Sequence, residues 1–138
     1  MIIIETVRER VGAAASREEA LTSCMDAFGL IERICGEYAA RRESELYPAW
    51  MSAIAPACNG RRALGASLPR DPDAGSAESD PDGTREDEIA GRLAVLAAAL
   101  RDRLQEITGQ AADLPLQQAC QRGIAAAEEI RLLLDADG

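Results

Sequence analysis

The side chains available for chemistry in this chain of 138 residues are carboxylates, tyrosines, cysteines and arginines, because the sequence contains neither histidine nor lysine. Without histidine there is no side chain that ordinarily titrates near neutral pH, no Ser-His or Cys-His nucleophile and no imidazole ligand for a metal ion. Without lysine there is no Schiff-base chemistry. No glycine-rich phosphate-binding loop occurs either. These absences exclude most common active sites, and we expect a protein without a cofactor.

An aromatic group is the densest set of residues that could bind a ligand. Tyr38, Tyr47 and Trp50 fall within about four helical turns of one another, together with Cys35. Such rings usually pack in a core and bond their polar atoms to a neighbour. If a cavity lies beside them instead, Tyr38, Arg42 and an acid at its edge could hold a small carboxylated or hydrophobic molecule. The sequence leaves both possibilities open.

The cysteines are predicted to be small core residues and not metal ligands or disulfides. They lack the paired C-x-x-C spacing of a zinc site. No signal peptide and no apolar run long enough to span a membrane is visible, so we expect a cytoplasmic protein in a reducing compartment. We predict neither a metal site nor a membrane partner. The four positions are Cys24, Cys35, Cys58 and Cys120.

Composition and charge restrict the fold and the partners. A hydrophobic content of 47% in a chain of this length is enough for a single domain over residues 1–138. Aromatic residues make up only 3% of the chain while alanine and leucine abound, which favours helices over strands. The net charge of −9 repels a phosphate backbone, so nucleic acid is not expected as a partner.

The first half of the chain predicts a short helix followed by a long, kinked one. Apolar residues at spacings of three and four indicate a helix from about Ile3 to Val11. Ser16 and Glu19 form a capping box that begins the second helix. Pro48 should kink that helix or restart it, and Tyr47, Trp50, Met51 and Ile54 then carry the apolar face onward. The inward stripe of the second helix is Leu21, Cys24, Phe28, Ile31, Cys35 and Tyr38.

The second half predicts a long acidic loop and two more helices. Residues 66–83 are rich in proline, glycine, serine and acids, which is typical of a flexible connector. Thr84 begins a third helix with a stripe from Ile89 to Ile107. Asp113 caps a last helix, whose stripe of partly small residues runs from Leu116 to Leu134. The sequence therefore predicts an all-α fold, an up-down-up-down four-helix bundle with the long loop between its second and third helices.

Two short stretches resemble the metal-binding motifs of hemerythrin-like domains. Residues 42–48, with the sequence RESELYP, are similar to the end of the first half-motif, where two acids, two spacers and a Leu-aromatic-Pro ending follow a histidine. Residues 128–133, with the sequence EEIRLL, are similar to the second half-motif. The resemblance implies a four-helix architecture over most of the chain.

The resemblance also implies that the metal ligands have been replaced. Tyr38 and Ile124 stand where the family has ligand histidines, Arg42 stands where it has a ligating carboxylate, and Glu128 keeps its acid. Iron and oxygen binding should then be lost, because a di-iron core needs several converging nitrogen and oxygen ligands. The replacements suggest an ion pair between Arg42 and Glu128 in the former metal site. The alternative is that both are ordinary surface residues.

We therefore predict a metal-free helical-bundle binding protein that recognises a protein partner or a small apolar or anionic ligand. We expect a homodimer formed through a helix face rich in alanine and leucine. The alternative is a cofactor-independent enzyme in which Tyr38, Glu128 or a cysteine transfers protons while Arg42 holds an anionic substrate. An enclosed pocket would favour the enzyme and a filled core the binding protein. The predicted ligand-binding residues are Cys35, Tyr38, Arg42, Tyr47, Trp50, Cys120, Ile124 and Glu128.

Overall fold

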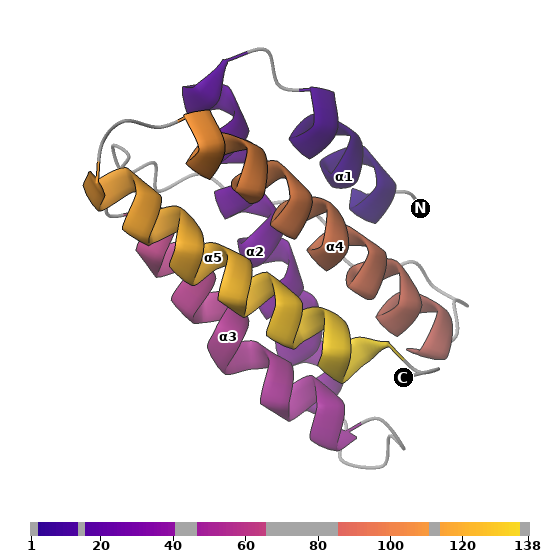
Figure 1. Cartoon of the computed structure of the whole chain (residues 1–138). Helices are drawn as coiled ribbons and strands as arrows, with labels where there is room; N and C mark the ends of the chain where they lie inside the picture. The colour runs from indigo at the N-terminus through magenta and orange to yellow at the C-terminus, as the bar shows by residue number, and fades with distance from the viewer. Residues whose placement is uncertain (1–2, 14–15, 41–46, 66–85, 111–113, 136–138) are drawn as a thin grey trace.

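The computed structural model describes residues 3–13, 16–40, 47–65, 86–110 and 114–135, and these contain five helices and no strand. The all-helical prediction is confirmed for these ranges, but five helices stand where the sequence predicted four. None of the described helices combines the length and apolar character needed to cross a membrane. The helices are α1 (Ile3–Ala13), α2 (Arg17–Ala39), α3 (Tyr47–Gly65), α4 (Glu86–Gln110) and α5 (Leu114–Leu134) (Figure 1).

The helix starts follow local sequence signals. The Ser16 side-chain oxygen accepts a hydrogen bond of 3.1 Å from the backbone N–H of Glu19, as the predicted capping box requires. Pro48 and Pro115 are each the second residue of a helix, where the missing amide has no helical acceptor to lose. Thr84 and Asp113, the predicted starts of the last two helices, lie outside the described residues.

The kink predicted at Pro48 is wrong, whereas the alternative of a restart is confirmed, because α2 ends at Ala39 and a new helix, α3, begins at Tyr47 and runs back along α2. Three contacts define this antiparallel pair. Tyr38 stacks on Trp50 with ring centroids 4.9 Å apart, and the Arg61 Nε donates to Glu32 Oε1 at 3.0 Å. The Phe28 ring packs against Gly60. From the Phe28–Gly60 contact to the Tyr38–Trp50 contact, the position rises along α2 and falls along α3, so the chain reverses direction between the two helices.

The buried face of α3 also differs from the predicted one. Trp50 is fully buried, but Met51 is 47% exposed and Tyr47 and Ile54 are only half-buried. The stacking of Trp50 on Tyr38 fixes the rotation of α3, so that the inward residues after Trp50 follow at steps of three and four that begin with Ala53. These are mostly small, which explains why the apolar pattern was hard to recognise. The buried face consists of Trp50, Ala53, Pro56, Ala57, Gly60 and Leu64.

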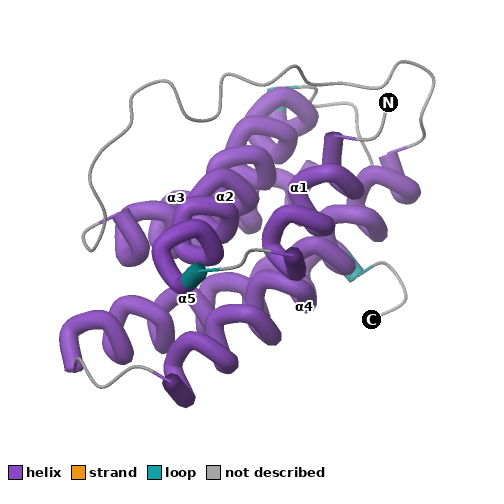
Figure 2. Tube along the Cα trace, turned by 90° about the horizontal axis from the view of Figure 1, so that it is seen from above, coloured by secondary structure: helices purple, strands orange, loops and turns teal. Residues whose placement is uncertain are grey.

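Helices α2, α3, α5 and α4 surround a common core in that order, and α1 lies against both α2 and α4 (Figure 2). Each neighbouring pair among the four is antiparallel, whereas α3 and α4 run in the same direction (Figure 1). The chain must therefore travel the length of the bundle between Gly65 and Glu86, roughly 35 Å for a helix of this size. This geometry accounts for a long connection between α3 and α4. The predicted loop itself, residues 66–83, lies outside the described residues.

Two glycines allow the helices to approach closely. A Cβ atom at Gly60 in α3 would lie 2.6 Å from the Phe28 ring of α2, and one at Gly123 in α5 would lie 2.8 Å from Leu104 Cδ1 of α4. Both positions thus require the absence of a side chain. Among the described residues no charged side chain is buried. The core is an apolar, closely packed interior to which α5 contributes small residues, as the sequence predicted.

Candidate functional site

The aromatic half of the predicted site lies in the interior between α2 and α3. Tyr38 is 4% exposed and Trp50 is fully buried, with their ring planes inclined by 20°. Cys35 is buried in the same core, while Tyr47 is half-buried at the start of α3. Arg42 lies outside the described residues. The described rings fill space against each other and against the core.

The other half of the predicted site lies along α5, on the far side of the bundle from α2. Cys120 is buried and Ile124 is half-buried. The side chain of Glu128 is 36% exposed and lies on the outer seam between α4 and α5. The structure therefore places Glu128 outside the interior that holds Tyr38.

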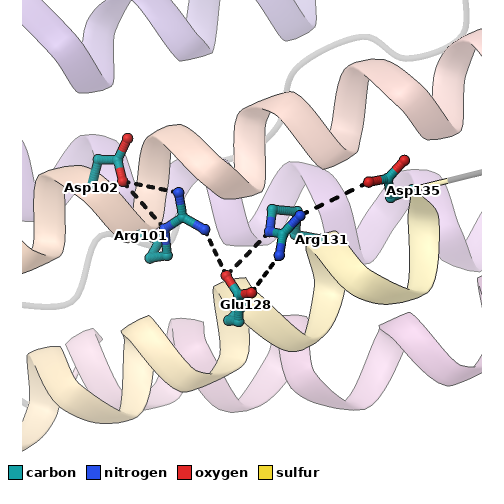
Figure 3. A network of polar contacts seen from close by, with 5 residues as sticks. All are labelled: Arg101, Asp102, Glu128, Arg131 and Asp135. Carbon is teal, nitrogen blue, oxygen red and sulfur yellow. Dashed lines mark hydrogen bonds and ion pairs between the residues drawn. The ribbon is translucent and has the colours of Figure 1, made fainter. Parts of the chain in front are cut away.

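Glu128 is the centre of a polar network that crosses from α5 to α4 (Figure 3). Arg101 Nη1 donates to Glu128 Oε1 at 2.7 Å, and Arg131 Nη2 donates to Glu128 Oε2 at 2.5 Å. Asp102 accepts from Arg101 at 3.2 Å, and Asp135 lies 3.9 Å from Arg131. Charge-assisted hydrogen bonds of this kind are about twice as strong as neutral ones. The network therefore holds α5 against α4.

The two arginines also set the charge state of Glu128. Hydrogen bonds from Arg131 and then Arg101 lower the pKa of its carboxyl from the ordinary 4.5 to about 2. The same contacts raise the pKa of both guanidinium groups. Glu128 is therefore ionised at neutral pH and carries no proton to donate. Its contacts are those of a structural ion pair.

Three of the cysteines are buried core residues, as predicted. Burial raises the thiol pKa of Cys24 and of Cys35 to about 12, and it also raises the pKa of Cys120. Thiols in this state are poor nucleophiles, because the thiolate is the reactive form. Cys58 differs, since it is half-exposed and its sulfur lies 3.9 Å from Arg61 Nη2. In the described part of the chain, no three Cys, Asp or Glu side chains converge as a metal site would need.

The described surface has a groove that sequence reasoning missed, between the outer sides of α3 and α5. Its volume is about 710 Å³. Small side chains on both helices leave this space open, since none of them reaches across to the opposite helix. These small residues are Pro56, Ala63, Ala119, Ala125 and Ala126.

Polar residues and exposed apolar residues complete this surface. Arg62 and Arg122 lie in the groove on opposing helices, and Glu129 lies two helical turns further along α5. Leu132 lies one turn beyond Glu129 on the same side of α5, and Met51 lies about three turns before Arg62 on the same side of α3; these residues are 61% and 47% exposed. We call the groove and these two residues the α3–α5 face. The signal in the sequence was the small residues of both helices, which include the half-buried Ala63 and the exposed Ala125.

Comparison with protein-family models, curated proteins and solved structures gives no significant match for this chain. The resemblance to hemerythrin-like domains stays a prediction based on the two short stretches. The geometry of the α3–α5 face is therefore the basis for a functional proposal.

Proposed function

We propose that this chain is a metal-free helical-bundle binding protein whose α3–α5 face receives a helix of a protein partner. The observation that carries the proposal is the groove itself, an open hollow between two antiparallel helices whose lining side chains are mostly small. Small residues allow two helix backbones to approach to the short end of the usual 8–10 Å range. A helix laid into a groove is a common mode of protein recognition.

The apolar residues at one end of the face favour a protein partner over a small ligand. Met51 and Leu132 are more exposed than most large apolar residues of this chain, and they lie beyond the hollow. A partner helix can cover the hollow and both side chains together, whereas a small molecule would cover only the hollow. Arg62 and Arg122 supply polar contacts that fix the orientation of the partner.

The enzymatic alternative requires an acid or base matched to neutral pH. Glu128, with a pKa of about 2, and the buried thiols, with raised pKa values, do not have this property. The proposal therefore includes no reaction. It does include the predicted cytoplasmic location, because all four cysteines are free thiols.

Photo-crosslinking in the native host cells tests the proposal. A benzophenone amino acid replaces Ala125 in the groove, and the matched control carries it at Val95, an exposed apolar position on α4. We expect a defined crosslinked protein from position 125 that is absent from position 95 and is lost when Leu132→Glu is added. Equal crosslinking from both positions would show that the α3–α5 face is not a docking surface.

A further inference from the structure

We infer that the helix received by the α3–α5 face belongs to a second copy of this chain, with α5 of one protomer lying antiparallel to α5 of its partner. This inference deepens the proposed function and rests on it. It follows from the distribution of charge on the face and from the way in which a twofold axis would repeat that distribution.

The charges on the α3–α5 face are complementary to those on the same face of a second copy. Arg122 and Glu129 are both exposed on α5, and they lie on either side of the exposed Ala125 and the buried Ala126. In an antiparallel pairing centred between the two alanines, Arg122 of each protomer comes opposite the partner's Glu129. The twofold axis generates this ion pair twice. Alanines at the centre let the two helices approach, as small residues do wherever backbones meet closely.

The positions of the arginines select one of two possible symmetric arrangements. An axis parallel to the helices would stack α3 on the partner's α5 and bring Arg62 close to the partner's Arg122, because Leu64 of α3 lies beside Gly123 of α5 and the two arginines are therefore within about one turn of the same level. Like charges in direct contact are unfavourable. An axis perpendicular to the helices stacks α5 on α5 and separates these arginines. It also lays the exposed Leu132 over the partner's helix near Ala119.

Charge also makes this face a better site for the association of two copies than the rest of the surface. The chain carries a net charge of −9, so two copies repel each other at long range. The groove holds two arginines and one acid and is therefore locally cationic. In the part of the chain that the structure describes, Arg122 and Glu129 take part in none of the intramolecular ion pairs. Both are available to a second copy.

Sedimentation equilibrium of the purified full chain tests the inference. The variants are Arg122→Glu, Glu129→Arg and the double exchange, and the control is Arg10→Glu, which makes the same charge change at an exposed position of α1. We expect a dimer for the native chain. Each single variant should weaken it about tenfold or more, because it turns two attractive pairs into repulsive ones. The double variant should restore the dimer and the control should leave it unchanged.

Three results would overturn the inference. The native chain could remain monomeric, the single variants could dimerise as the native chain does, or the double variant could fail to recover. Circular dichroism on each variant establishes that it is folded. The proposed function has a separate outcome, because a monomeric chain that still crosslinks a different protein from position 125 would retain the docking face and lose only the second copy as its occupant.

Discussion

The two flanks of α5 differ in the partners of their charged residues. On the flank that faces α4, Glu128 binds Arg101 and Arg131 within the chain, and Gly123 fits closely against Leu104. On the flank that faces the α3–α5 groove, Arg122 and Glu129 border an open hollow. One side of α5 thus completes the fold, and the other side borders the groove that we propose as the binding surface. Glu128 and Glu129 are adjacent, yet Glu128 is ion-paired within the chain, while in our proposal Glu129 binds a second copy.

The same contrast between an inward and an outward side appears on α3, and it gives the largest expected effect. Trp50→Ala should reduce the free energy of unfolding by about 3–5 kcal/mol, because it removes a fully buried ring that stacks on Tyr38. Met51→Ala, its exposed neighbour, should change stability by about 0.5 kcal/mol or less. Urea unfolding followed by circular dichroism measures both. Similar losses for the two variants would refute the rotation of α3 described above.

The two flanks of α5 should also differ in how far a larger side chain lowers the stability of the fold, and this effect is smaller than that of Trp50→Ala. Gly123→Leu should destabilise the fold by about 3 kcal/mol, because even a Cβ at this position lies 2.8 Å from Leu104 Cδ1. Ala125→Leu adds its side chain to the open groove and should leave the stability of the monomer nearly unchanged. Unfolding at low protein concentration compares the two. A large loss for Ala125→Leu would mean that the groove is filled in solution.

Glu128 and Glu129 should differ in how they make stability depend on pH. This is the smallest of the expected effects. The folded pKa of Glu128 lies near 2, below its ordinary value of 4.5, so its stabilising contribution is complete above about pH 4.5 and is lost as the pH falls toward 2. The stability difference between the native chain and Glu128→Gln should therefore shrink over this range. At a protein concentration low enough to keep the chain monomeric, Glu129→Gln is the matched control and should track the native chain. Thermal unfolding across the range provides the measurement, and a pH-independent difference for Glu128→Gln would contradict the network.

The sequence predicted those elements whose inward residues are large. Every residue of the predicted α2 stripe, from Leu21 to Tyr38, is buried, and so is the α4 stripe from Ile89 to Ile107. On α5 the predicted Ile124 is only half-buried and Gly123 lies inward beside it. On α3 the inward positions are mainly Ala, Pro and Gly, which carry little periodic signal. At Pro48 the sequence left a kink and a restart both open, because a proline in the first turn of a new helix looks the same in sequence as a proline inside a kinked helix.

The candidate site could be predicted only in part, because it depends on how the helices are placed against each other. Glu128 was recognised as important, but its partner Arg101 lies 27 residues away and is brought to it by the antiparallel register of α4 and α5. The α3–α5 groove likewise exists only because α3 folds back beside α5. A linear pattern of alanines contains no information about which two helices become neighbours.

The central claim is that the groove flank of α5 lies against another protein chain, and a symmetric disulfide tests it most directly. Ala125→Cys is placed in a Cys58→Ser background, so that the other native thiols are buried. The claimed arrangement brings the two new cysteines together near the twofold axis, within reach of a disulfide. We predict a covalent dimer under mild oxidation at low concentration, while Val95→Cys in the same background remains monomeric. Equal crosslinking of the two variants, or none from Ala125→Cys, would contradict it.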